Sequence, residues 1–322
     1  MNDIIFGEPT TLSNKKRDIA LDYAKGFAII LIVVYHLYGY TGRWQGSVIY
    51  SFCHTVQLPI FFYVSGVLTS KNTTVNINLK KKFTRLIIPF LFFYFIWCFI
   101  NFQNIRIFVL EEFKGGYWFT LVLFEMMVFY SISFKLSQAI QVCPQLTLLG
   151  LFLILSFPKY LFPKDNIVYI TLSTNLFWHY FPFFYLGIIH SYICKVLKLK
   201  FSILFFILFC YTQYIYYTSN IKIMIPLCNL FSLLFFATLY FNNIRPYEEK
   251  IANIGRYSLQ IYLLHFFLVH YFSDFIPTIS NKIVECVLFF FISLIFIIFI
   301  IMISNILLRN KCTRLLFFGL KQ

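Results

Sequence analysis

The chain has 322 residues, of which 60% are hydrophobic and only 12% are charged, whereas an average soluble domain carries about 25% charged residues. Together with a mean hydropathy of +0.77, this composition excludes an ordinary soluble enzyme and a disordered chain. The net charge of +15 would suit a nucleic-acid-binding protein only if the basic residues gathered on a solvated face. They lie instead between long apolar runs, so we expect no nucleic-acid partner.

Ten apolar runs have about the length that a membrane-spanning helix needs. The hydrocarbon core is roughly 30 Å thick and requires about 20 residues of helix, and an open sheet cannot satisfy its backbone there. The predicted segments are 23–40, 48–68, 86–103, 116–137, 145–162, 176–194, 201–217, 223–241, 258–272 and 283–308. The sequence therefore predicts an all-α polytopic membrane bundle of about ten transmembrane helices, with both termini on one side.

The basic residues predict the orientation of this bundle. Nineteen of the 27 Lys and Arg residues fall on the side of the N-terminus and seven fall in the opposite loops. Because cytoplasmic loops carry the excess of Lys and Arg, we expect both termini to be cytoplasmic, in a bacterial-type cytoplasmic membrane. The expected organisation is a cytoplasmic segment over 1–22, an uncleaved transmembrane bundle over 23–308 and a cytoplasmic tail over 309–322.

The eight cysteines occur singly, without CxxC spacing. Buried free cysteine behaves as a small hydrophobic residue. We therefore interpret these residues as apolar packing rather than as metal ligands or disulfide partners, and we expect no metal site.

Ionisable residues at bilayer depth are costly, so each is a candidate for a functional role. In the first predicted helix, Lys25 and His36 are eleven residues apart, about 20° past three full turns and roughly 16 Å along the axis. The two residues share one face, and Asp22 lies one turn before Lys25, where it can pair with it. His36 is a candidate base because imidazole takes a proton near neutral pH, whereas Asp22 and Lys25 can also be a simple interfacial pair.

Four further residues are candidates at or near membrane depth. His54 is expected at a depth similar to that of His36, and His265 lies in the middle of the ninth predicted helix. Glu125 lies about nine residues into the fourth, where a carboxylate must be protonated or matched to a cation. Trp118 precedes it and can stack on a sugar face, although aromatic belts at the membrane interface have the same composition. For each of these residues, simple packing remains the alternative.

The densest basic run is Lys80–Lys82 with Arg85, just before the third apolar run. Lys82 and Arg85 are three residues apart, so on a helix they point the same way and can bind phosphate oxygens. The alternative is that these charges only contact anionic lipid on the cytoplasmic side.

Six stretches resemble, in their order, the acyltransferase-3 family of integral membrane acyltransferases, and within it the sugar O-acetyltransferases. They are DYAKGFAIILIVVYH (22–36), QLPIFFYVSG (57–66), KKFTRLIIPF (81–90), YWFTLVLF (117–124), FPFFYLG (181–187) and SLQIYLLH (258–265). The first two together are fairly specific, and the six span most of the chain. The resemblance implies a ten-helix membrane enzyme that uses cytoplasmic acyl-CoA to acylate a carbohydrate or a lipid-linked glycan.

The resemblance also implies roles for individual residues. Lys25 and His36 match the basic residue and the required histidine of the family's first helix, and Lys82 and Arg85 match its basic pair, typically Arg-x-x-Arg, before the third. Much of the family has arginine at the position of Lys25, and lysine keeps the charge without the planar fork. The chain ends at Gln322, so we expect the bundle itself to complete the transfer.

The resulting hypothesis is an O-acetyltransferase with His36 as general base and acetyl-CoA as co-substrate, without a tightly bound cofactor. Lys82, Arg85 and Lys25 are predicted to contact acyl-CoA. The residues expected to line or support the site are Asp22, His54, Trp118, Glu125 and His265. The expected partners are a glycan or lipid-linked oligosaccharide acceptor and membrane lipids, and an acyl-histidine intermediate stays open.

Two readings from other classes also stay open. In a transporter or flippase for a lipid-linked glycan, the intramembrane His and Glu residues would relay protons. The third reading is a non-catalytic membrane partner of a polysaccharide assembly complex. Cleavage or transfer of the acetyl-CoA thioester by the purified protein would separate the enzyme from both.

Overall fold

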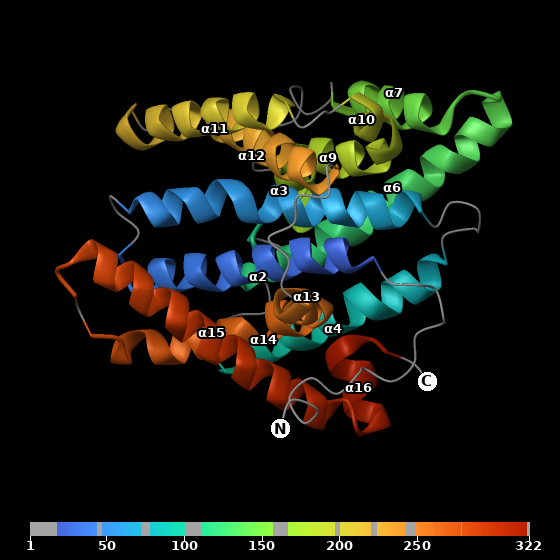
Figure 1. Ribbon diagram of the computed structural model, residues 1–322. Coiled ribbons are helices and arrows are strands. Elements are labelled where there is room, and N and C mark those ends of the chain that lie inside the picture. The colour runs from blue at the N-terminus through green and yellow to red at the C-terminus, as the bar shows by residue number, and fades with distance from the viewer. Residues whose placement is uncertain are drawn as a thin grey trace. The chain divides into compact units, whose positions relative to one another are not determined.

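The computed structural model shows a chain whose described residues form helices connected by turns (Figure 1). It describes residues 18–43, 47–71, 78–100, 111–156, 167–196, 200–219, 224–241, 249–277 and 279–320. Three predicted apolar segments extend outside this part, at residues 101–103, 157–162 and 223, and so do residues 1–17 of the expected N-terminal segment and 321–322 of the expected tail. The helices fall into two compact units, one made of Met1–Val64 and Ser191–Arg309 and the other of Ser65–His190 and Asn310–Gln322.

Each of the ten predicted apolar segments contains a helix. These helices are α2 (Ile19–Tyr40), α3 (Val48–Ser70), α4 (Leu79–Ile100), α6 (Trp118–Ile140), α7 (Pro144–Ser156), α9 (Thr174–Ile188), α11 (Lys200–Ser219), α12 (Met224–Phe241), α14 (Ser258–Phe272) and α15 (Lys282–Leu307). Within the described residues, six are long and apolar enough to cross a membrane, namely α2, α3, α4, α6, α11 and α15. The all-α membrane architecture is therefore confirmed, while the count of ten passes and the orientation of the termini stay predictions.

In the first unit, α2 packs against α13 (Glu249–Arg256), α14 and α15, and α11 packs against α12. Helix α2 begins after Asp18, whose carboxylate accepts hydrogen bonds from the backbone N–H groups of Ala20 and Leu21, and so caps two of the free donors of the first turn. It ends at Tyr40, and Gly42 then takes a positive φ of 70° in the following turn. Most of α2 is buried, which makes it the central helix of this unit.

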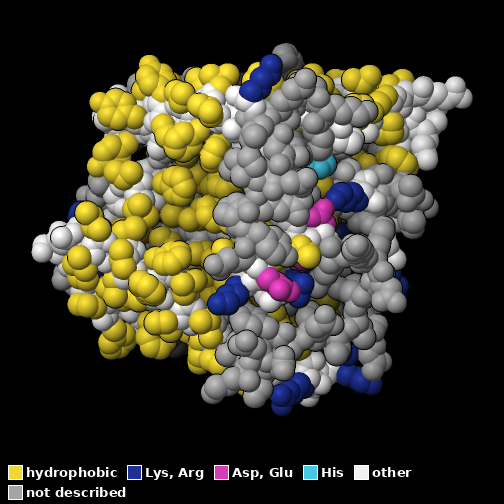
Figure 2. Space-filling view, in the orientation of Figure 1, with side chains coloured by type: hydrophobic (Ala, Val, Ile, Leu, Met, Phe, Trp, Pro, Cys, Tyr) yellow, Lys and Arg dark blue, Asp and Glu magenta, His cyan; other side chains and the backbone are white. Residues whose placement is uncertain are grey.

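Hydrophobic side chains remain exposed on the outer helices of the first unit. On the face shown in Figure 2, they gather over α11, α14 and α15. The exposed residues of α15 include Ile283, Phe291 and Ile295, whose exposed fractions are 77%, 58% and 63%. A soluble protein rarely exposes so continuous an apolar surface, whereas lipid covers such a surface without cost.

In the second unit, α6 packs against α4, α7 and α9. The unit also contains the one-turn helix η1 (Lys114–Gly116), α8 (Ile167–Thr171) and α16 (Lys311–Phe318), which is part of the expected C-terminal tail and packs on α4. Gly319 ends α16 with a φ of 62°, and any side chain there would collide with the backbone of Thr84. The two short remaining helices, α10 (His190–Val196) and η3 (Ser273–Phe275), follow α9 and α14.

Candidate functional site

His36 lies in the last third of α2, with its ring turned toward α14. The side chain is half-buried. Its ring centroid is 5.1 Å from that of His265 and 4.6 Å from that of Phe266, both on α14. Tyr40, one turn further along α2, lies 6.5 Å from the same ring. The imidazole therefore points into the first unit, among aromatic and histidine side chains, rather than toward lipid.

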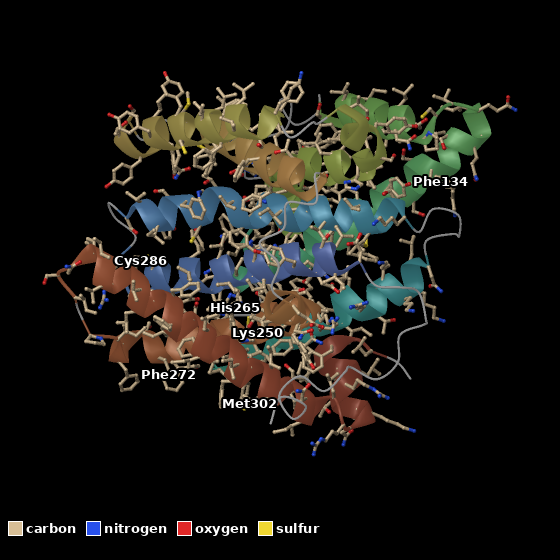
Figure 3. The ribbon with its side chains drawn as sticks, viewed as in Figure 1. Phe134, Lys250, His265, Phe272, Cys286 and Met302 are labelled. Atoms are coloured by element: carbon tan, nitrogen blue, oxygen red, sulfur yellow. The ribbon has the colours of Figure 1, made fainter. Side chains whose placement is uncertain are left out.

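His265 is completely buried beneath this contact, and Figure 3 shows it on the side of α14 that faces α2. Its Nδ1 lies 3.0 Å from the carbonyl oxygen of Ile261 and 2.8 Å from that of Tyr262. Among the described residues, its Nε2 is buried without a hydrogen-bond partner. Phe266 packs on the same ring at 4.3 Å, so the orientation of the His265 imidazole is tightly constrained.

His54 joins this cluster through Tyr35, the neighbour of His36 on α2. The ring of Tyr35 stacks on the rings of His54 and Tyr50, with centroid distances of 5.7 Å and 4.5 Å. The Tyr50 hydroxyl donates a hydrogen bond of 2.9 Å to the Tyr35 hydroxyl. Tyr35 contacts α3 and its neighbour His36 contacts α14, so His54 and His36 lie at about the same level along α2. Their similar depth in the membrane stays a prediction.

Asp22 and Lys25 form the ion pair that their spacing predicted. The ammonium of Lys25 contacts the Asp22 carboxylate within α2, and Arg256 of α13 approaches the other carboxylate oxygen at 3.9 Å. The Asp22 side chain is only 6% exposed, whereas those of Lys25 and Arg256 are 20% and 22% exposed. One buried carboxylate thus faces two partly exposed cations.

Arg256 is a residue that the sequence analysis counted only as a loop charge. It reaches Asp22 because α13 crosses α2 at very short range. A Cβ on Gly26 would collide with the backbone of Ile251, and a Cβ on Gly255 would collide with the backbone of Asp22. The two glycines are the sequence signal for this crossing, since only a missing side chain lets two helix backbones approach so closely.

Lys82 and Arg85 lie in the first two turns of α4, in the second unit. Both side chains are half-buried, whereas the neighbouring Lys80 and Lys81 are exposed. Helix α16 packs against the same turn, because Gly319 lies against the backbone of Thr84 and Arg85. The pair is thus held on a packed helix, on the same face as expected from their spacing.

Trp118 and Glu125 also belong to the second unit, where both lie on α6. Trp118 is buried and its ring stacks on Tyr180 of α9 at 5.5 Å. Within the described residues, the Oε1 atom of Glu125 is buried without a hydrogen-bond partner. They are seven residues apart, which places them on one face of α6 two turns from each other.

Lys114 supplies positive charge near Glu125. This lysine lies in η1, is completely buried, and donates hydrogen bonds to the carbonyl oxygens of Glu111 and Ile170 at 2.7 and 2.8 Å. Burial lowers the pKa of Lys114 to about 8, and the carboxylates of Glu111, Glu112 and Glu125 oppose that shift. Lys114 thus supplies the cation that we expect near a carboxylate at membrane depth.

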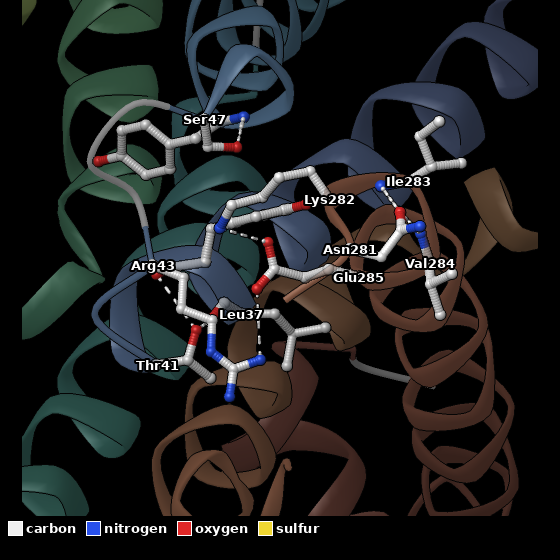
Figure 4. Close-up of polar contacts among 11 residues, drawn as sticks. Leu37, Thr41, Arg43, Ser47, Asn281, Lys282, Ile283, Val284 and Glu285 are labelled. Carbon is white, nitrogen blue, oxygen red and sulfur yellow. Dashed lines mark hydrogen bonds and ion pairs between the residues drawn. The ribbon is translucent and has the colours of Figure 1, made fainter. Parts of the chain in front are cut away.

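A buried ion pair beyond the end of α2 was not among the predicted site residues. Figure 4 shows Arg43 and Glu285, which lie 3.5 Å apart, with Lys282 at 3.2 Å from the other Glu285 oxygen. Arg43 also donates a hydrogen bond of 3.0 Å to the carbonyl of Ile276 and lies over the ring of Phe289. These contacts join the turn after α2 to α15 and to the segment after α14, so they hold the end of α2 that carries His36.

The structure thus brings together His36, His265 and, through Tyr35, His54 within the first unit, with Asp22 and Lys25 near the start of the same α2. Lys82, Arg85, Trp118 and Glu125 lie in the second unit. In the described part of the chain, no group of three His, Cys, Asp or Glu side chains is arranged to hold a metal ion. The described residues therefore offer two imidazole rings in contact, those of His36 and His265, and the cationic side chains of Lys25, Lys82 and Arg85.

Comparison with known proteins assigns the chain by its overall pattern. A family model described as an acyltransferase domain, of the acyltransferase-3 type, matches residues 18–305. The match begins at the residue that caps α2 and ends near the end of α15. No curated protein and no solved structure matches the chain.

Proposed function

Because the chain belongs to the acyltransferase-3 family of membrane acyltransferases, we propose that it moves an acetyl group from acetyl-CoA to a hydroxyl of a cell-surface glycan or of its lipid-linked precursor. The observation that carries this proposal is the family match over residues 18–305, which coincides with a bundle of apolar helices. The membrane acyltransferase activity follows from the family. The acetyl donor, the glycan acceptor and the residues that act on them belong to the proposal.

His36 acts as the general base of the proposed reaction. The acceptor hydroxyl oxygen attacks the thioester carbonyl, and neutral His36 removes the hydroxyl proton as the new C–O bond forms. The C–S bond then breaks, and the thiolate of CoA takes the proton back from the imidazolium, so that the products are the acetyl ester and free CoA. The position of the His36 ring among α14 side chains supports this role, because it holds the ring in one orientation.

The thioester is already activated, so the remaining work is alignment and stabilisation of the oxyanion. Lys82 and Arg85 bind the phosphates of CoA on the cytoplasmic side, and Lys25 is a third cation that contacts acyl-CoA. Their partial exposure supports this assignment, because a phosphate-binding side chain must be reachable from water while being held by its helix. Asp22 orients Lys25.

The acceptor is bound by aromatic and acidic side chains of the second unit in this proposal. Trp118 offers a ring face for stacking on a sugar, and Glu125 offers a carboxylate for hydroxyl groups. Their location on one face of α6 supports this assignment. The protein works in a bacterial-type cytoplasmic membrane, where the donor comes from the cytoplasm and membrane lipids surround the apolar outer helices.

Mass spectrometry of surface glycans tests this proposal directly. Glycans from cells that carry the gene should contain a species heavier by one acetyl group, which is missing after deletion and restored by the wild-type gene. Complementation with His36→Ala at equal protein abundance should fail to restore it. Glycans of identical mass in the deleted and complemented cells would contradict the proposed acceptor class.

A further inference from the structure

The Nε2 atom of His265 is buried and has no hydrogen-bond partner among the described residues. Its Nδ1 faces two backbone carbonyl oxygens, of Ile261 and Tyr262. A carbonyl oxygen only accepts hydrogen bonds, so Nδ1 carries the proton of the neutral ring. The lone pair of the ring therefore resides on Nε2, and this atom is completely buried without a partner among the described residues.

An acceptor buried in this way is costly unless some donor reaches it. The side chain of His36 is in ring contact with His265, at a centroid distance of 5.1 Å and an interplanar angle of 47°. Phe266 touches both imidazoles, at 4.3 and 4.6 Å, and so restricts how either ring can turn. In the structure as it stands, His36 makes no hydrogen bond to Nε2. A rotation of the His36 ring within this contact would direct one of its N–H groups at that atom.

We propose that His265 is the positioning residue of His36: its Nε2 accepts a hydrogen bond from one ring nitrogen of His36, so that the other ring nitrogen presents its lone pair to the acceptor hydroxyl. This inference rests on the proposed function. In this assignment, His36 contacts the acceptor hydroxyl, and His265 acts only through its hydrogen bond to His36.

The proposed hydrogen bond supports each step of the transfer. Before the reaction, it fixes the tautomer of His36, so the nitrogen that faces the hydroxyl carries no proton. When His36 takes the hydroxyl proton, both of its nitrogens carry hydrogen, and the N–H toward His265 donates a charge-assisted bond. His265 keeps its own Nδ1 proton throughout, held by the two carbonyls, and the proton of the imidazolium passes to the CoA thiolate.

Two substitutions at position 265 separate this role from packing. His265→Gln retains an amide acceptor at about the place of Nε2, whereas His265→Asn retains a donor near Nδ1 but lacks the distant acceptor. His270→Gln is the matched control, because His270 lies on the same helix and contacts Tyr40 rather than His36. The readout is the release of CoA thiol from acetyl-CoA by the full-length protein in nanodiscs made with lipids from the host membrane.

We expect His265→Asn to lower kcat by on the order of tenfold to a hundredfold, the effect of one hydrogen bond to a charged group. The KM for acetyl-CoA should stay within about twofold, and His265→Gln should recover part of kcat. The His270→Gln control should match the wild type. Full activity of His265→Asn, in a preparation where His36→Ala is inactive, would overturn the role of His265 alone. Full activity of His36→Ala would instead overturn the proposed function.

The wild-type protein provides a second test that does not depend on folding of the variants or on activity. In protein labelled with [15N]histidine, the neutral His36 and His265 rings should each appear in a single tautomer, with the His265 proton on Nδ1. The two sets of resonances are assigned sequentially, through the backbone, in the wild-type protein itself. A mixture of His36 tautomers, or a His265 proton on Nε2, would overturn the inference.

Discussion

At the scale of single residues, the ion pair between Arg43 and Glu285 joins the turn after α2 to α15, at the end of α2 that carries His36. Glu285 is 2% exposed and Arg43 is 13% exposed, and Arg43 is also bonded to the carbonyl of Ile276. Breaking a buried pair leaves one charge without compensation, which costs several kcal/mol. The sequence analysis counted Arg43 only as one basic residue of an outer loop. Its partner Glu285 is more than 240 positions away and is one acidic residue in the strongly apolar helix α15.

Replacing Glu285 should therefore destabilise the protein. We expect Glu285→Gln to cost about 3 kcal/mol of folding free energy and to lower the apparent melting temperature in detergent by roughly 5 °C or more. Lys282→Gln is the matched control, because the ammonium of Lys282 contacts the same carboxylate but is 68% exposed. An exposed pair contributes about 1 kcal/mol or less. Equal melting temperatures for both variants would show that burial of the Arg43 pair is irrelevant to stability.

Lys82 and Arg85 are half-buried, whereas Lys80 and Lys81 of the same basic run are exposed. We expect the double variant Lys82→Gln/Arg85→Gln to raise the KM for acetyl-CoA by about tenfold or more, because each loses a charge-assisted bond to phosphate. In the double variant Lys80→Gln/Lys81→Gln, the same charge is removed from exposed residues of the same turn. Its KM should stay within about twofold. Equal changes in the two double variants would indicate an effect of net charge on lipid contact instead of a phosphate site.

At the scale of elements, the crossing of α2 and α13 positions the charges at the start of α2. Gly26 and Gly255 allow the two backbones to touch, and this contact brings Arg256 to Asp22. The sequence analysis found the long helices because each is a run of apolar residues. It missed α13 because eight residues with charges at both ends resemble a loop. It missed the helical form of the C-terminal tail, α16, because that helix is also only eight residues long and its first four include Lys311 and Arg314.

A side chain at the crossing should force the two helices apart. We expect Gly26→Ala to destabilise the protein by about 1–3 kcal/mol and to lower the acetyl-CoA cleavage rate, since α2 also carries His36. Gly39→Ala is a matched control on the same helix, because a Cβ there meets nothing within 4 Å. It should be neutral or stabilising by up to about 1 kcal/mol. A melting temperature of Gly26→Ala equal to that of Gly39→Ala would mean that α13 does not hold α2.

At the scale of the whole molecule, hydropathy and charge predicted the fold class but not the internal contacts of the site. The spacing of Asp22, Lys25 and His36 followed from helix geometry alone, and the ion pair between the first two is confirmed. The contact of His36 with His265 joins residues more than 220 positions apart, which no local pattern encodes. His265 could be singled out from the sequence only as an ionisable residue at membrane depth, without a partner.

The predicted orientation can be measured with reporter fusions to this chain. Alkaline phosphatase, which is active only outside the cytoplasm, should be inactive when fused after Ser70 or after Gln322 and active when fused after Gly42. A cytoplasmic fluorescent protein should give the reverse pattern. The reason is the excess of Lys and Arg in the loops on the side of the termini. Phosphatase activity after Gln322 would contradict an even number of passes with both termini in the cytoplasm.

The base function of His36 is the central claim, and it is tested most directly by CoA thiol release from acetyl-CoA in nanodiscs made with host membrane lipids. His36→Ala should lower the rate by roughly 10²–10⁴-fold, the usual contribution of a general base, with an unchanged melting temperature. His270→Ala, a histidine variant on α14 whose ring contacts Tyr40 and Tyr271, serves as the control and should retain the wild-type rate. A His36→Ala rate equal to that of the control would contradict the account.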